Sequence, residues 1–397
     1  MTGSLESLRE LNRLRVVDAL RNDGTASRAD IARRTGLSRS TVSTLVADLQ
    51  RHGLVVERSL PAVARQGRPP VQLALDPSAG AAVGIDFDHD EVRVAVSDLT
   101  RSVLADATAR LDVDNDAVCA MDHAAQLVES VLNEAGVDRK KVVGAGMALA
   151  GPVDHERGAL HPSPILAGWA NVDAAAEVAQ RIGIPVHLDN DANLGALAEV
   201  TLGAGRNART AAYVQMSSGI GAGLIVDGLP YHGHCGTAGE IGHVLVDEQG
   251  PICRCGNRGC LETLASGPAL VAMLRSSHGD DLTVDGMIAM AHEGDPGARR
   301  AVADAGRAVG QVVAALCNRF NPEMVVVGGT MSTAGEVLLE PLRESIERYA
   351  LPAATDGLEV VAGELGERAN VLGALALAIA QSGEAVAARI AGTVSAA

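Results

Sequence analysis

Residues 236–262 read GTAGEIGHVLVDEQGPICRCGNRGCLE, and this is the most informative stretch of the chain. It places Cys253, Cys255 and Cys260 within eight positions, and His243 precedes the first cysteine by ten. Three thiolates and one imidazole make a complete tetrahedral zinc set, with no position left open for water. Glycines within the run allow the backbone to fold tightly enough to aim three sulfurs at one point. The pattern predicts one structural zinc ion per chain, with a reduced thiol cluster or a redox switch as the alternatives.

The composition around this stretch is that of a folded protein with more than one domain. The chain has 397 residues, with 47% hydrophobic and 21% charged residues, and it is too long for a single ordinary core. Aromatic residues make up only 2%, which argues against a base-stacking platform for single-stranded nucleic acid. We find neither a signal peptide nor an apolar run of the roughly 18 residues that a membrane span needs. We therefore expect a cytoplasmic protein that makes no membrane contact and whose six cysteines form no disulfide framework.

The net charge of −16 is distributed unevenly along the chain. Residues 1–75 contain twelve arginines and seven acids, for a charge of +5, whereas the remainder carries −21. An acidic body is repelled by nucleic acid, while a small basic module is attracted to its phosphates. The charge pattern therefore predicts a two-part molecule with a basic N-terminal module.

Helical periodicity divides this module into three helices. Apolar residues recur at helical spacing in the first, namely Leu5, Leu8, Leu11, Leu14, Val17 and Leu20. A second helix is predicted over Ser27–Thr35, with Ser27 as its N-cap, and a third over about Arg39–His52. A tight turn at Gly36 separates the last two, and helix, short glycine-containing turn and helix is the helix-turn-helix arrangement.

Short polar side chains gather at the N-terminal end of the third helix, as suits a helix lying in a DNA major groove. They are Arg39, Ser40, Thr41, Ser43 and Thr44. Two strands, Leu54–Arg58 and Val71–Leu75, are predicted to form a wing, and arginines in its loop can reach a minor groove. These arginines are Arg65 and Arg68. The module is expected to bind double-stranded DNA; the alternative is a helical interaction module with solvated arginines.

Breaker residues at 76–80 mark the expected boundary between a DNA-binding domain, 1–76, and a second domain, 80–397. The second domain alternates strands with longer helices, which indicates an α/β architecture. Strands are predicted over Ala81–Phe87, Val92–Asp98, Val142–Leu149, Val186–Leu188, Ala211–Gln215, Gly223–Val226 and Met324–Val327. Helices are predicted over about Ala117–Ala135, Val172–Ile182 and Gly297–Arg319. We expect two lobes, about 80–190 and 191–380, with the C-terminal helix returning to the first.

With the sequence GTAGEIGH at 236–243, the cysteine run and Leu261-Glu262, the chain resembles the ROK family of repressors, open reading frames and kinases. The resemblance covers almost the whole length and implies a two-lobed, actin-like ATPase fold. The N-terminal module makes it similar to the xylose-repressor and N-acetylglucosamine-repressor branch. It implies sugar contacts from residues at the cleft, namely Asn190, Asp191, Glu240, His243 and Glu262. N-capping of a helix that begins near Ala192 is the alternative role for Asp189 and Asp191.

The resemblance also implies where a kinase would act. The family's kinases use the aspartate matching Asp191 as general base, and Ser217–Gly223 matches the second phosphate loop, although its glycines are equally suited to simple turns. In the first phosphate loop the kinases carry an Asp-x-Gly-Gly-Thr-Lys type sequence. Here Asp86–Glu91 reads DFDHDE, which lacks the glycines and adds acids that repel a polyphosphate. We therefore predict no kinase activity.

The sequence thus predicts a sugar-responsive transcriptional regulator, a repressor of carbohydrate-metabolism genes released from its operator by a sugar or sugar phosphate. Two-fold operators require at least a dimer, so a homodimer or homotetramer is expected. An ATP-dependent hexose or N-acetylhexosamine kinase is the alternative, and a zinc or thiol redox sensor is a third.

Overall fold

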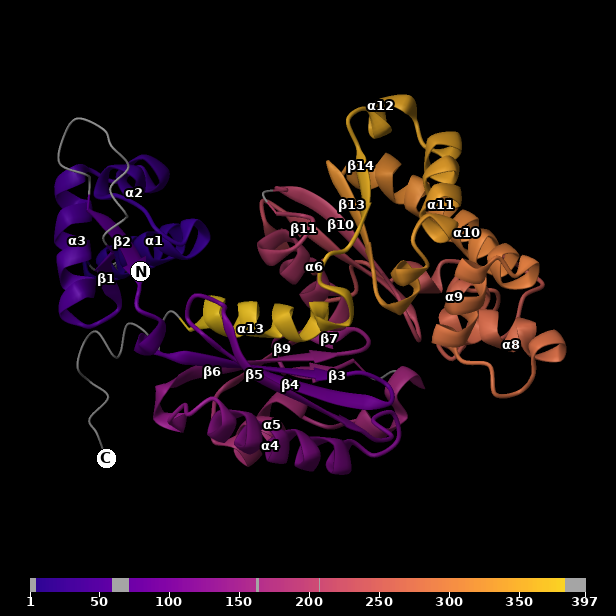
Figure 1. Ribbon diagram of the computed structural model, residues 1–397, viewed down its shortest axis with the longest axis horizontal. Helices are drawn as coiled ribbons and strands as arrows, with labels where there is room; N and C mark the ends of the chain where they lie inside the picture. The colour runs from indigo at the N-terminus through magenta and orange to yellow at the C-terminus, as the bar shows by residue number, and fades with distance from the viewer. Residues whose placement is uncertain (1–4, 59–70, 162–163, 207, 383–397) are drawn as a thin grey trace.

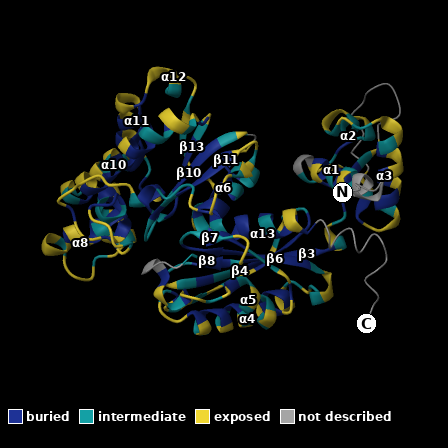
Figure 2. Cartoon of the chain, turned by 180° about the vertical axis from the view of Figure 1, so that it is seen from behind, coloured by how far each residue is buried: buried dark blue, intermediate teal, exposed yellow. Residues whose placement is uncertain are grey.

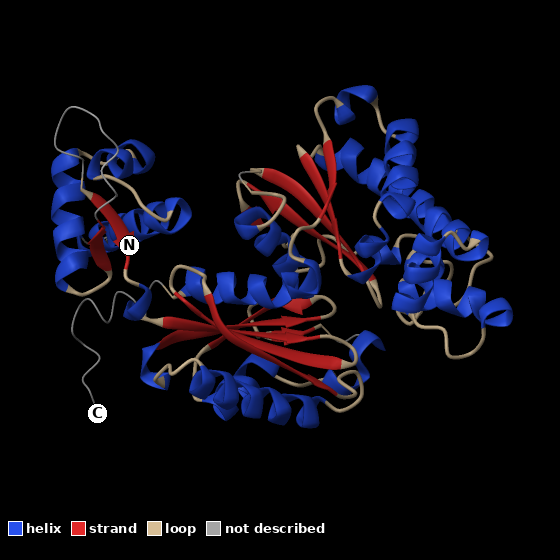
Figure 3. Ribbon diagram, viewed as in Figure 1, coloured by secondary structure: helices blue, strands red, loops and turns tan. Residues whose placement is uncertain are grey.

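The computed structural model describes residues 5–58, 71–161, 164–206 and 208–382 (Figure 1). A small helical module stands beside two lobes, each built on a five-stranded sheet. Figure 3 shows helices covering both sheets, which is the predicted α/β architecture. None of the described helices is long and apolar enough to cross a lipid bilayer.

The N-terminal module has the predicted helix-turn-helix and wing. Its elements are α1 (Leu5–Asp23), α2 (Arg28–Thr35), α3 (Arg39–Arg51), β1 (Val55–Arg58) and β2 (Gln72–Leu75). The predicted N-cap is confirmed, because Ser27 accepts a hydrogen bond from Asp30 N and Asp30 bonds back to Ser27 N. The turn into α3 needs a glycine, since Gly36 has a φ of +69°. Arg65 and Arg68 lie outside the described residues.

The predicted apolar stripe of α1 is wrong at its centre. Leu11 is 58% exposed, whereas Val16, Val17 and Leu20 are buried against the rest of the module. Residues spaced three apart drift by about 60° per step around a helix of 3.6 residues per turn. A run of leucines at that spacing therefore leaves the buried face, and the core takes Val16 instead.

The first lobe contains a sheet with the strand order β5-β4-β3-β6-β9. Its strands are β3 (Ala81–Phe87), β4 (Glu91–Asp98), β5 (Val103–Arg110), β6 (Val142–Leu149) and β9 (Val186–Asn190), with a small hairpin of β7 (Val153–Asp154) and β8 (Ala159–Leu160). Helices α4 (Ala117–Glu134) and α5 (Ala174–Ile182) cover one face. The C-terminal helix α13 (Ala369–Gln381) lies on the opposite face, against β3 and β6.

The second lobe repeats this plan with the strand order β12-β11-β10-β13-β14. Its strands are β10 (Thr210–Met216), β11 (Ile220–Val226), β12 (Leu229–Pro230), β13 (Met324–Gly328) and β14 (Glu359–Ala362). Its helices are α6 (Asp191–Leu202), α7 (Glu262–Ala265), α8 (Gly267–His278), α9 (Val284–Glu293), α10 (Pro296–Phe320), α11 (Glu336–Tyr349) and α12 (Pro352–Thr355). In both sheets three antiparallel strands are followed by two parallel ones, as in the actin-like fold.

Helix α6 packs on the second sheet and crosses α13, which packs on the first. The crossing is close, because a Cβ on Gly373 would lie 1.9 Å from the carbonyl oxygen of Leu194. Only a glycine permits the two backbones to approach this far. The α6–α13 crossing is therefore the packed joint between the lobes.

The N-terminal module and the first lobe share one apolar core. Val17 and Leu20 of α1 belong to the same buried cluster as Leu99, at the end of β4, and Leu375 of α13. The Arg21 side chain, only 5% exposed, donates from Nε to the carbonyl oxygen of Leu99 at 3.3 Å. Figure 2 shows buried residues lining both sheets, with exposed residues on the outer helices. The module is thus packed against the first lobe rather than held by a linker alone.

Candidate functional site

One pocket between the lobes brings together all five residues predicted to contact a sugar. Asn190 ends β9 and Asp191 begins α6, so both lie where a strand of the first lobe passes into a helix of the second. Glu240 precedes a short 3-10 turn, Ile241–His243, that ends at His243, and Glu262 begins α7. The pocket is polar, as recognition of vicinal hydroxyl groups requires.

The two residues at the start of α6 are held by their neighbours. Asn190, and neither of the aspartates suggested by the sequence, caps the helix by accepting from Asn193 N at 3.2 Å. Its Nδ2 donates to the Gly151 carbonyl at 3.1 Å and to Asp191 Oδ1 at 2.8 Å. The other oxygen, Asp191 Oδ2, accepts from Gln215 Nε2 at 2.7 Å. The Asp191 carboxylate is therefore fixed before any ligand arrives.

Burial makes ionisation of the pocket's acids unfavourable. Desolvation raises the pKa of Asp191 to about 6, and hydrogen bonds from Ala192 N and Gln215 oppose the shift. Desolvation raises the pKa of Glu240 to about 7, with further contributions from the charges of Asp191 and Glu262. Hydroxyl groups that donate to these oxygens would compensate the ionised form. The pocket is therefore suited to a ligand rich in hydroxyl donors.

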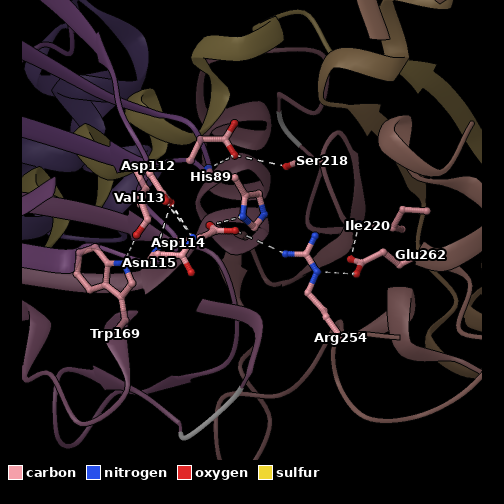
Figure 4. A network of polar contacts seen from close by, with 11 residues as sticks. His89, Asp112, Val113, Asp114, Asn115, Trp169, Ser218, Ile220, Arg254 and Glu262 are labelled. Carbon is pink, nitrogen blue, oxygen red and sulfur yellow. Dashed lines mark hydrogen bonds and ion pairs between the residues drawn. The ribbon is translucent and has the colours of Figure 1, made fainter. Parts of the chain in front are cut away.

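A polar network that the sequence did not predict crosses the pocket (Figure 4). From the first lobe, His89 Nδ1 lies 2.6 Å from Asp114 Oδ1. Arg254 reaches between the lobes, 4.0 Å from Asp114 Oδ2 and 3.5 Å from Glu262 Oε1. Glu262 in turn accepts from Ile220 N at 3.2 Å and holds the turn between β10 and β11. In the sequence, Arg254 lies between Cys253 and Cys255. This position within the cysteine motif is the feature from which a role for Arg254 could have been predicted.

His243, Cys253, Cys255 and Cys260 form one cluster, with their ligand atoms all within 4.8 Å of one another. Sγ of Cys253 is 3.6 Å from His243 Nδ1, and the sulfurs of Cys255 and Cys260 are 3.8 Å apart. Tetrahedral zinc with bonds of about 2.3 Å to sulfur and 2.0 Å to nitrogen requires separations of roughly 3.5 to 3.8 Å. The cluster has the dimensions of a metal site, and His243 Nε2 faces Glu240 Oε2 at 3.8 Å.

A second cavity of about 400 Å³ is lined by residues of the segment Asp86–Glu91, which was compared above with the first phosphate loop. Most titratable groups in its wall are acids, namely Asp86, Asp88, Asp90, Glu91, Asp285 and Glu367. Arg110 and His89 are the basic side chains that line it among the described residues. Of the glycine-rich turn predicted at 217–223, residues 217–219 connect β10 to β11 at the edge of this cavity, and residues 220–223 belong to β11.

The helix predicted to enter DNA presents its polar residues to solvent. Arg39, Ser40, Ser43 and Thr44 are exposed and Thr41 is half-buried, whereas Val42, Leu45, Val46 and Leu49 form the core side of α3. In the free protein two hydroxyls bond to their own helix: Ser43 Oγ donates to Arg39 O, and Thr44 Oγ1 donates to Ser40 O. The exposed serine and threonine side chains are short, so the helix remains thin enough to enter a DNA major groove.

Comparisons with known proteins agree with this architecture. The chain is 32% identical to the xylose repressor of Caldicellulosiruptor bescii, over 95% of this chain and 97% of that protein. It is 34% identical to the glucokinase of Thermotoga maritima, over 74% of this chain and 96% of that one. The solved structure of a ROK family transcriptional regulator, a homologue of the E. coli Mlc protein, matches with a TM-score of 0.81 and 25% identity, covering 97% of this chain and 99% of the other.

Two family models cover separate parts of the chain. The MarR family model matches residues 10–66, and the ROK family model matches residues 82–381. The first match includes α2, α3 and most of α1, and the second includes both lobes. The chain belongs to the ROK family and carries a MarR-type winged helix at its N-terminus.

Proposed function

We propose that the protein is a transcriptional repressor that binds operator DNA and releases it when a sugar or sugar phosphate occupies the pocket at Asp191. The observation that carries this proposal is the combination of a polyol-type pocket and a DNA-binding module in one packed structure. The relatives that match most of the chain include xylose repressors and the repressor Mlc. In this proposal residues 1–76 bind DNA and residues 80–397 bind the sugar.

Contacts at the two ends of α6 suggest how the signal travels. The helix begins at Asp191 in the pocket, and Leu202 at its far end packs against the core shared with the DNA-binding module. Sugar binding would favour one arrangement of the lobes and so change the spacing of paired modules in a dimer or tetramer. The sugar can shift DNA affinity only by its own preference for one arrangement.

Double-stranded DNA is proposed to meet the exposed end of α3 in its major groove. Arg39, Ser40, Thr41, Ser43 and Thr44 would face the bases, with Arg65 and Arg68 of the wing reaching a minor groove. The exposed polar side chains of α3 and the +5 charge of residues 1–75 support this orientation.

Zinc is the metal that best fits the cluster of one histidine and three cysteines. Four protein ligands leave no open position, so the ion would hold the segment from Glu240 to Glu262 in shape and take no part in chemistry. His243 would bind through Nδ1 while its Nε2 stays on the sugar side, beside Glu240. The metal would then position two sugar-binding residues.

The acidic wall around Asp86 favours a sensor without kinase activity. Asp191 and the likeness to a glucokinase favour the alternative, an ATP-dependent sugar kinase. Both proposals require Asp191, as a sugar acceptor in the first and as a general base in the second. ATP consumption therefore distinguishes them, and loss of sugar binding in a variant does not.

The test measures fluorescence anisotropy of labelled DNA from upstream of the chain's own gene. Xylose, glucose, N-acetylglucosamine and their phosphates are added with and without ATP. Release by one sugar without ATP is expected, and Asp191→Asn should abolish release while leaving DNA binding intact. Asp285→Asn, in the other cavity, is the matched control and should respond as the wild type does. Sugar-dependent ATP consumption without specific DNA binding would establish the kinase instead.

A further inference from the structure

A second cluster of metal-ligating side chains lies outside the cysteine site. The described residues contain two groups of histidine, cysteine and acid side chains whose ligand atoms all lie within 4.8 Å of one another, and His155, Asp189 and His232 form the second. Two imidazoles and one carboxylate make a common donor set for divalent first-row transition metals. Neither the pocket nor the DNA-binding module accounts for this cluster.

Distances within the cluster are close to those that a metal imposes. His232 Nε2 lies 2.8 Å from Asp189 Oδ2, and His155 Nε2 lies 3.7 Å from Asp189 Oδ1. Ligands bound at about 2.0 to 2.2 Å are roughly 2.9 to 3.4 Å apart in tetrahedral or octahedral geometry. Shifts of a few tenths of an ångström would therefore bring the three groups onto one ion.

The carboxylate at the centre of the cluster is both buried and oriented. The Asp189 side chain is only 3% exposed, and its Oδ1 accepts from Asn190 N at 2.7 Å and from Asn193 Nδ2 at 3.0 Å. These two bonds hold the carboxylate and direct Oδ2 towards His232. Outer partners of this kind are what orient a metal-ligating carboxylate.

A simple ion pair accounts for His232 but leaves the second imidazole unexplained. The rings of His155 and His232 lie 4.1 Å apart between centroids, so two imidazoles are pressed against one carboxylate. In the described part of the chain, His155 makes no hydrogen bond through its ring and only approaches Asp189 at 3.7 Å. A metal ion would satisfy both rings, whereas one proton can satisfy only one of them.

The three ligands come from segments that belong to different lobes. His155 lies in the turn between β7 and β8, and Asp189 lies on β9 of the first sheet; His232 follows β12 of the second sheet. The turn and the loop are pressed together, because His161 Nε2 lies 2.8 Å from the Cys235 carbonyl oxygen and a Cβ on Gly236 would lie 1.9 Å from the Val153 carbonyl oxygen.

We propose that His155, Asp189 and His232 bind a divalent transition-metal ion such as Zn²⁺ that bridges the two lobes, next to the pocket residue Asn190 in the chain. Water completes the coordination, since the protein supplies three ligands. Because the ligands come from both lobes, bound metal stabilises the arrangement in which the lobes are in contact. The site is separate from the cysteine cluster, so the chain holds two metal ions.

Metal content of the untagged full-length protein tests this assignment. After loading with Zn²⁺ and dialysis, mass spectrometry of the metal should give two equivalents per chain, and the double variant His155→Gln/His232→Gln should give one. His278→Gln is the matched control, because His278 also faces a carboxylate, Asp295 at 3.2 Å, without a second imidazole; it should keep two. One equivalent in the wild type, or two in the double variant, would overturn the proposal.

If the double variant folds poorly and its metal content falls for that reason, cobalt substitution still distinguishes the two sites. Co²⁺ at the cysteine cluster gives intense thiolate charge-transfer absorption, whereas Co²⁺ bound by two imidazoles and a carboxylate gives only weak visible bands. The double variant should lose the weak bands and keep the charge-transfer band. A second equivalent of Zn²⁺ should raise the Tm of the wild type and leave that of the variant unchanged. Equal Tm shifts in both proteins would contradict a metal that binds at these histidines.

Discussion

Asp86 is an acid buried in an otherwise apolar strand. Its side chain is 5% exposed on β3, and its Oδ1 has no hydrogen-bond partner among the described residues. Desolvation holds the pKa of Asp86 well above its ordinary value, and the charges of Asp88 and Asp191 add to the shift. In the Asp-x-Gly-Gly-Thr-Lys loop that the resemblance implies for the family's kinases, glycines let the backbone meet phosphates; here Asp88 and His89 fill those positions. The buried carboxyl of Asp86 therefore costs folding stability when it is ionised.

The cost of burying Asp86 in folding stability increases as the pH rises. A carboxyl whose pKa is raised on folding binds its proton more tightly in the folded state, so folding stability falls as pH rises from the unfolded pKa towards the folded one. Asp86→Asn removes this loss. Its gain over the wild type should be larger at pH 8, on the order of 1 kcal/mol, than at pH 5. Chemical denaturation at both pH values measures it.

Asp90→Asn is the control, since Asp90 is an exposed acid in the same loop. It should change stability little at either pH. An equal gain for Asp86→Asn at pH 5 and pH 8 would show that the charge of Asp86 is not the cause.

Individual residues could be predicted from the sequence where a motif fixes several of them together. The cysteine cluster and the five pocket residues were found in this way, and the structure brings each group together. His89 and Asp114 were missed because they lie 25 residues apart and share no motif, and Arg254 meets Asp114 only across the cleft. His155 and His232 were missed because they come from separate segments that meet only in the folded chain.

At the scale of the structural elements, the segment from Glu240 to Glu262 contains little regular secondary structure. It contains one 3-10 turn before α7, and turns with glycine shape the rest; a Cβ on Gly259 would lie 1.6 Å from the Asp247 carbonyl oxygen. Such a segment buries little apolar surface and depends on its cross-links. The cysteine cluster is the cross-link that it contains.

Loss of one ligand from this cluster should therefore affect more than the metal. Cys255→Ser is expected to lose zinc, to lower the free energy of unfolding by at least about 2 kcal/mol and to weaken sugar binding at least tenfold. Metal analysis, denaturation and calorimetry measure the three effects. Cys119→Ser changes a thiol of α4 outside the cluster and should alter none of them. Unchanged sugar affinity in the demetallated variant would refute the link between metal and pocket.

The crossing of α6 and α13 supplies a prediction about packing. Gly373→Ala would place a methyl group 1.9 Å from the Leu194 carbonyl oxygen, so the helices must separate. We expect a loss of about 2 to 3 kcal/mol in the free energy of unfolding. Gly144→Ala is the matched control, because the nearest atoms to its Cβ are 3.8 Å away, and it should cost less than about 1 kcal/mol. Equal losses would show that close backbone approach is unimportant at the joint.

Elements were predictable from periodicity in proportion to how much of them is buried. The seven predicted strands all occur, since strands such as β3 are buried along their full length. Strand β5 was missed, because at the sheet edge its buried and exposed residues are mostly alanines and polar groups. The sequence also did not reveal that the two lobes share one sheet plan, because they share the order of the strands and not the residues.

On the scale of the whole molecule, Arg21 is placed to link the DNA-binding module to the body. Its buried guanidinium spans from Asp18 of α1 to the carbonyl oxygen of Leu99 beyond β4. Arg21→Ala should leave sugar affinity unchanged but reduce the coupling between sugar and DNA by about 1 kcal/mol, roughly fivefold in the ratio of the two DNA Kd values. Operator titrations with and without the sugar measure this ratio.

Arg33→Ala provides the comparison. Arg33 is a 77% exposed arginine of α2 that pairs with Asp30 of the same helix. Its removal lowers the positive charge facing DNA and should weaken DNA binding to the same extent with and without sugar. If both variants preserved the wild-type ratio, the contact at Leu99 would carry no signal.

The core shared by α1, β4 and α13 has a consequence for building hybrid regulators. Exchanging only the first 76 residues between two ROK repressors would join unmatched halves of one apolar core, even though the breaker residues at 76–80 resemble a natural fusion point. A working hybrid must carry the turn after β4 and the matching face of α13 along with the donor's winged helix. Operator recognition in this protein therefore depends on parts of its sugar-binding body, and its winged helix cannot be exchanged alone.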